Sequence, residues 1–111
     1  MLTIAHVPNT ISVRAALQPA QVDSLATLHV ETRDPQVVSR ITRAIETTKE
    51  TPTDRGADLR YAIRIRHSRG VTTTIYMDAF GLRGVVDGRP VRFASDAIKR
   101  AIVEAYPQLA Q

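Results

Sequence analysis

The chain contains no cysteine, so disulfide bonds, thiolate metal sites and thiol nucleophiles are all excluded. It also has no tryptophan, and aromatic residues make up only 5% of it. No stretch approaches the roughly 18 to 20 consecutive apolar residues that a membrane-spanning helix requires. The first residues, "MLTIAHVPNT", lack the charged and apolar regions of a signal peptide. These absences predict a soluble, cytoplasmic protein without a membrane partner.

Motifs for catalysis and cofactor binding are missing as well. Neither a phosphate-binding P-loop nor a dinucleotide fingerprint occurs, and no serine lies in a nucleophile-elbow motif. The histidines at positions 6, 29 and 67 are far apart in the sequence. His29 and Glu31 share one face of a predicted strand, but a metal site needs a third and a fourth ligand. We therefore predict no cofactor, no metal and no enzymatic activity.

The length and composition indicate one folded domain. A chain of 111 residues suffices for one hydrophobic core but not for two ordinary domains. With 43% hydrophobic and 23% charged residues, it falls within the globular range. We expect a single domain over residues 1–111.

Alternating polar and apolar residues indicate strands in the N-terminal third. Strands are predicted in "LTIAHV", which is the weakest candidate, in "ISVRAAL" at residues 11–17 and in "ATLHVET" at residues 26–32. Pro19, at a first helical position, predicts a short helix in "PAQVDSLA". Residues 1–10 are expected to be only loosely attached.

The clearest helix is predicted after Asp34 and Pro35. The carboxylate of Asp34 is placed to cap the helix, and proline is favoured at the first helical position. One apolar stripe follows at spacings of three and four residues, made of Val37, Val38, Ile41, Ala44 and Ile45. The next segment is polar and contains proline and glycine, so residues 50–58 are predicted to form a flexible loop.

A first hairpin is predicted around a three-residue loop at residues 68–70, in which Gly70 is left-handed. This loop length sets the register of the two strands. The core face then pairs Ile65 with Thr73, Ile63 with Ile75, and Tyr61 with Met77. The opposite face pairs Arg66 with Thr72, Arg64 with Thr74, Ala62 with Tyr76, and Arg60 with Asp78.

A second hairpin is predicted around Asp87 and Gly88, the strongest short-range turn signal in the chain. Its register places Arg83 opposite Arg92, which is an unfavourable pair of like charges unless an anion lies between them. A last helix is predicted from Ser95 to the residue before Pro107. The order of elements predicts an α+β fold: N-terminal strands and a four-stranded meander in a mostly antiparallel sheet, with two amphipathic helices on one face.

Basic residues concentrate in the hairpin segment. Residues 59–93 contain seven arginines and two acids, a net charge of +5, whereas the rest of the chain carries −1. Arginine suits bidentate recognition of carboxylate or phosphate, although a solvated sheet face also needs polar residues for water alone. The candidate binding residues are Arg60, Arg64, Arg66, Tyr76, Arg83 and Arg92.

The favoured interpretation is a non-enzymatic regulatory domain, of inhibitor or immunity type, that docks a protein with an acidic surface through this face. The alternative is a nucleic-acid-binding module, in which the same arginines contact phosphates and Tyr76 stacks on a base. A further alternative is a subunit that forms a homodimer through an N-terminal edge strand such as residues 11–17.

Overall fold

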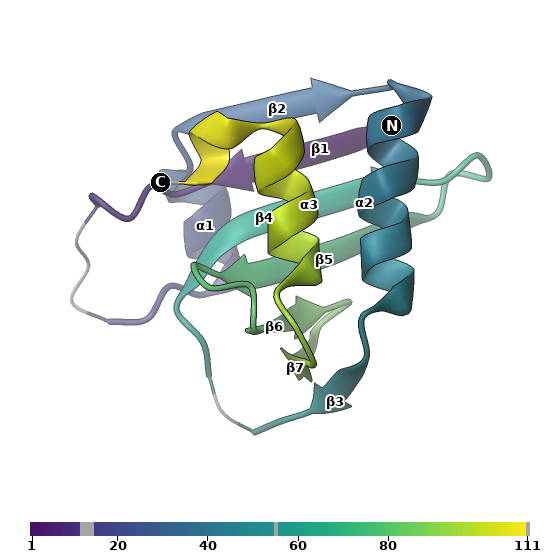
Figure 1. The fold of residues 1–111 in the computed structure, drawn as a ribbon. Helices are drawn as coiled ribbons and strands as arrows, with labels where there is room; N and C mark the ends of the chain where they lie inside the picture. Colours follow the sequence, from purple (N-terminus) through teal and green to yellow (C-terminus); the bar gives the residue numbers. More distant parts are fainter. Residues whose placement is uncertain (12–14, 55, 111) are drawn as a thin grey trace.

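One antiparallel sheet of seven strands forms the middle of the molecule (Figure 1). The computed structural model describes residues 1–11, 15–54 and 56–110. The strands lie in the order β2-β1-β4-β5-β6-β7-β3, so β4 to β7 form the predicted meander and the α+β class is confirmed. The strands are β1 (Leu2–His6), β2 (Leu28–Thr32), β3 (Glu50–Pro52), β4 (Leu59–Arg66), β5 (Thr72–Asp78), β6 (Arg83–Val86) and β7 (Arg89–Phe93).

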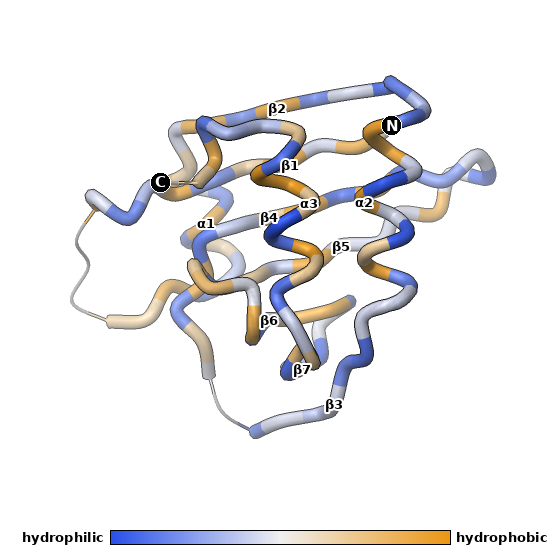
Figure 2. Tube along the Cα trace, in the orientation of Figure 1, coloured by the Kyte–Doolittle hydropathy of each residue, from blue (hydrophilic) through white to orange (hydrophobic). Residues whose placement is uncertain are grey.

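Two helices, α2 (Pro35–Thr47) and α3 (Ala97–Ala105), pack side by side on one face of this sheet (Figure 1). The carboxylate of Asp34 accepts a hydrogen bond from the backbone N–H of Gln36 at 2.9 Å, as predicted for the start of α2. In Figure 2, polar and apolar residues alternate along both helices, as expected when one stripe of each helix is buried. A third helix, α1 (Pro19–Leu25), packs on the opposite face, and a 3-10 helix, η1 (Pro107–Ala110), follows α3.

The sheet separates two clusters of buried side chains. The larger cluster lies under α2 and α3 and includes Ile63 from β4 and Ile41 from α2. The smaller cluster lies under α1 and contains Val22 and Ala62. Because successive side chains of a strand point to opposite faces, β4 supplies both clusters. The face under α1 is the one on which Arg64 and Arg66 of β4 lie.

Both predicted hairpins are confirmed. Ile63 lies opposite Ile75 in the first, and Gly70 has the left-handed φ of 82° that its loop requires. In the second hairpin, Arg83 lies opposite Arg92. Asp87 and Gly88 have φ angles of 47° and 83°, so the turn is of the type that Asp-Gly favours.

The N-terminal segments differ from the expectations. Leu2–His6 is not loosely attached, because β1 pairs with both β2 and β4. Residues 12–14, in the middle of the strand predicted over residues 11–17, lie outside the described residues. Leu17 is buried, and its N–H donates to the carboxylate of Asp58 at 2.8 Å.

The loop predicted over residues 50–58 is also shorter than expected, because Glu50–Pro52 forms β3 and pairs with β7. Residue Thr53 continues this contact, since its N–H donates to the carbonyl of Pro90 at 3.2 Å. A three-residue polar strand has too little periodicity to be distinguished from a loop, and its pairing depends on a strand that lies about forty residues later.

Candidate binding face of the sheet

The face opposite α2 and α3 is only partly covered by α1, and five of the six predicted binding residues, Tyr76 and four arginines, lie on its open part or at its border. Arg64 and Arg66 come from β4, Arg83 from β6 and Arg92 from β7. They share this face with Ala62 and Tyr76, since Ala62 lies opposite Tyr76 across the β4–β5 pair. We call this surface the basic face.

Arg64 is held in place by a small polar network. Its Nη2 donates to both carboxylate oxygens of Asp23, at 2.9 and 3.1 Å, and to the hydroxyl of Tyr76 at 2.7 Å. The Tyr76 hydroxyl donates in turn to Asp23 at 2.9 Å. Burial, together with this hydrogen bond to Asp23, raises the pKa of Tyr76. The phenol therefore stays protonated and remains a donor at neutral pH.

This network orients Arg64 without using all of its donors. The guanidinium carbon lies 5.6 Å from the centre of the Tyr76 ring, within the range of a cation–π contact. The side chain of Arg64 is still 37% exposed. Nε and Nη1 make no hydrogen bond to any residue that the structure describes, so their donors remain available to a ligand.

Arg83 and Arg92 face each other across the pair of strands β6 and β7. In the neighbouring pair, the Phe93 N–H donates to the Leu82 carbonyl at 2.8 Å. Hydrogen-bonded and non-hydrogen-bonded pairs alternate along an antiparallel ladder, so no backbone hydrogen bond joins Arg83 and Arg92. Side chains come closest at such pairs. Among the residues that the structure describes, no carboxylate lies within ion-pair distance of either guanidinium. The predicted repulsive pair is therefore present.

Arg60 does not belong to the basic face, which corrects the prediction. The register shifts between Leu59 and Tyr61, so that Leu59 and not Arg60 lies opposite Asp78. Arg60 is 7% exposed. Its guanidinium pairs with Asp58 at 3.0 Å and donates to the carbonyls of Pro8 and Ile11, at 3.2 and 2.9 Å. These contacts join distant segments, so Arg60 has a structural role.

Asp78 likewise has a different partner from the one predicted. Its carboxylate accepts hydrogen bonds from the backbone N–H groups of Leu82 and Arg83, at 2.9 and 3.3 Å. It therefore closes the turn between β5 and β6. Gly81, which has a left-handed φ of 73°, lies in that turn.

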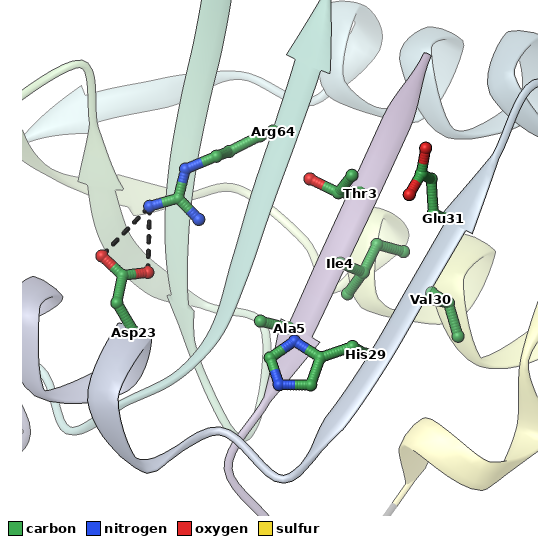
Figure 3. Close-up of a pocket in the computed structure, with 8 residues that line it drawn as sticks. All are labelled: Thr3, Ile4, Ala5, Asp23, His29, Val30, Glu31 and Arg64. Carbon is green, nitrogen blue, oxygen red and sulfur yellow. Dashed lines mark hydrogen bonds and ion pairs between the residues drawn. The ribbon is translucent and has the colours of Figure 1, made fainter.

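A groove of about 610 Å³ runs along the basic face beside α1 (Figure 3). Asp23 and Arg64 form one wall, His29 and Glu31 of β2 form the other, and Thr3 and Ala5 of β1 lie between them. Sequence reasoning placed His29 and Glu31 on one face but missed Asp23. No local signal marks Asp23, because its role depends on how α1 folds back onto the sheet.

The donor groups of this groove do not form a metal site. Within residues 1–11, 15–54 and 56–110, no group of three or more histidines and acids is close enough to hold an ion. No helix of the described residues is long and apolar enough to cross a membrane.

Comparison with known proteins identifies no relative: no family model, no curated protein and no solved structure matches the chain.

Proposed function

We propose that this chain is a non-enzymatic binding domain that docks an acidic segment of a protein partner on its basic face. The observation that carries this proposal is the pair of Arg83 and Arg92, which face each other and form no ion pair with any acid of the described residues. Like charges directly opposite on paired strands are destabilising. A carboxylate bound between the two guanidinium groups removes that repulsion and gains forked hydrogen bonds from both.

Arg64 and Arg66 extend this surface along β4. Arg66 is exposed, and Arg64 presents the donors that Asp23 and Tyr76 leave unused. An acidic peptide lying across the sheet would meet Arg64 and Arg66 near one end and the Arg83–Arg92 pair near the other. Steering by the basic segment would raise the association rate. Regulation, inhibition or immunity fits such docking, and a cytoplasmic location stays a prediction.

The alternative of nucleic-acid binding is less well supported by the position of Tyr76. A base would need its open ring, but the ring lies beside the Arg64 guanidinium and its hydroxyl is bonded to Asp23. The arginines alone could still attract phosphates. The test therefore includes oligonucleotides as a second class of ligand.

The experiment is fluorescence anisotropy with a labelled glutamate-rich peptide and with labelled single-stranded and duplex oligonucleotides. The variant is Arg83→Glu/Arg92→Glu, and the matched control is Arg40→Glu/Arg43→Glu on the exposed side of α2. Both double variants change the net charge equally. We expect the first to weaken peptide binding at least about tenfold and the second to change it less than about threefold, because only the first alters contacts as well as the distant field.

Two results would overturn the proposal. Equal weakening by the two double variants would mean that binding follows net charge alone. Micromolar oligonucleotide binding that falls steeply between about 50 and 200 mM salt, without peptide binding, would favour the nucleic-acid alternative. A folding check by circular dichroism separates loss of binding from loss of structure. The double variant keeps a like-charge pair at this position, so its stability should stay close to that of the parent.

A further inference from the structure

The outer edge of β2 is a second surface with unused bonding groups. β2 lies at one end of the sheet and, among the described strands, pairs only with β1. The Arg66 N–H donates to the Met1 carbonyl at 2.9 Å, and the N-terminal ammonium of Met1 donates to the Arg66 carbonyl at 3.3 Å. At the other end of the pairing, the Val7 N–H donates to the Arg60 carbonyl at 2.8 Å. Backbone groups of alternate residues point to opposite sides of a strand, so the odd-numbered residues of β1 bond to β4 and the even-numbered ones to β2.

This alternation along β1 determines which backbone groups of β2 point outward. Leu28 and Val30 lie opposite His6 and Ile4, so their backbone groups point to β1. The N–H and C=O groups of His29 and Glu31 therefore point away from the sheet. No strand or helix of the described residues lies beyond β2 (Figure 1). An edge with free donors and acceptors is a template for another strand.

The other edge of the sheet is protected, which makes β2 the exception. In β3, Lys49 C=O accepts from Ala94 N–H at 2.8 Å and Thr53 N–H donates to Pro90 C=O, so the odd-numbered residues face β7. The outward groups belong to Glu50 and Pro52, and proline has no N–H to donate. Shortness and proline are devices that discourage edge pairing. β2 is longer, contains no proline and has no register shift in its pairing with β1.

We propose that β2 pairs with β2 of a second copy of this chain, antiparallel and centred on Val30, so that two sheets join into one. In this register His29 of each copy lies opposite Glu31 of the other. These are the residues whose backbone groups point outward, so each facing pair exchanges two hydrogen bonds. On each side of Val30, the imidazole of His29 faces the carboxylate of Glu31 from the other copy, so no like charges lie opposite each other.

The side chains at the centre fit the same arrangement. Val30 is half-buried and packs against the core cluster under α2 and α3. In the joined sheet it lies opposite Val30 of the second copy, at a pair without backbone hydrogen bonds, where side chains approach most closely. A β-branched apolar pair is favoured at that position. Two antiparallel copies of the segment "LHVET" therefore match each other in their backbone hydrogen bonds, their apolar contact and their charges.

The absence of cysteine allows a direct test by disulfide trapping. In Val30→Cys, the two thiols of a dimer lie on facing strands at a separation that a disulfide can span, whereas Glu50→Cys on the opposite edge is the matched control. We expect mild oxidation to cross-link the first variant at least about tenfold faster than the second, because proximity raises the effective concentration. Equal rates for the two variants would contradict the proposal.

Sedimentation equilibrium tests the same interface in the unmodified protein. We expect concentration-dependent dimerisation of the parent, and an increase of at least about tenfold in the dissociation constant for His29→Glu, which opposes two carboxylates at each facing pair. Mixing His29→Glu with Glu31→Lys should restore association, because each mixed dimer pairs a carboxylate with an ammonium group. A role of His29 in folding alone would not produce this recovery.

The outcomes are distinct. A parent protein that stays monomeric up to about 1 mM would overturn the proposal and would leave the β2 edge to a strand of another protein. A dimer that His29→Glu does not weaken would place the contact elsewhere on the molecule. Weakening by His29→Glu with recovery on mixing supports pairing through β2.

Discussion

Replacing Arg60 by methionine tests whether Arg60 stabilises the fold, as its contacts indicate, and does not belong to the basic face. Methionine keeps much of the apolar length of arginine but removes every donor. The carbonyls of Pro8 and Ile11 then lose partners at 3.2 and 2.9 Å. Each bond to a charged donor contributes roughly 1.5 kcal/mol. Asp58, which is 44% exposed, regains water and adds little. The free energy of unfolding should fall by about 3 kcal/mol.

Urea unfolding followed by circular dichroism measures this loss. With a slope of about 1.5 kcal/mol per molar urea, the midpoint of Arg60→Met should fall by about 2 M. The matched control is Arg66→Met, on the same strand, whose exposed side chain should change the midpoint by less than about 0.3 M. An unchanged midpoint for Arg60→Met would refute the reasoning. Folded Arg60→Met should still bind the acidic peptide, and loss of that binding would return Arg60 to the basic face.

Three further outcomes follow from individual contacts. Burial raises the pKa of Tyr61 to about 12, so the folded chain keeps a proton that the unfolded chain loses above pH 10. The free energy of unfolding, measured with urea, should therefore fall by about 1.4 kcal/mol between pH 8 and pH 11, and Tyr61→Phe should not show this fall. Gly84→Ala places a Cβ 1.9 Å from the carbonyl oxygen of Tyr76 and should cost at least about 3 kcal/mol in urea unfolding, whereas Gly56→Ala, with open space around it, should not. Arg92→Glu replaces a repulsive pair by an attractive one, so it should raise the thermal midpoint while weakening peptide binding.

The parts of the fold that could be predicted are those that local chemistry determines. The three-residue loop at Gly70 fixed the parity of the first hairpin, and alternation then paired Ile63 with Ile75. Asp87 and Gly88 fixed the second hairpin in the same way. Asp34 began a helix because its carboxylate satisfies a free amide of the first turn. In each case the deciding interaction joins residues close together in the sequence.

The parts that could not be predicted depend on contacts between distant segments. Arg60 fits the alternation of β4, and only the carbonyls of Pro8 and Ile11 explain why it turns inward at a register shift. Asp23 pairs with Arg64 because α1 folds onto the sheet, and no spacing in the sequence joins them. Five of the six predicted binding residues still share one face: Arg64, Arg66, Tyr76, Arg83 and Arg92. Alternation along each strand was enough to place them there.

The two proposed surfaces are related by the geometry of the sheet. Antiparallel pairing of β2 with a second copy places the two-fold axis perpendicular to the sheet, so the basic faces of both copies lie on the same side. A long acidic partner could then bind both faces, and its apparent affinity would exceed that of a short peptide without any new contact. His29→Glu should remove only this advantage, leaving binding of a short peptide unchanged, whereas Arg83→Glu/Arg92→Glu should weaken both. The two variants act at different places, so each proposal can fail while the other stands.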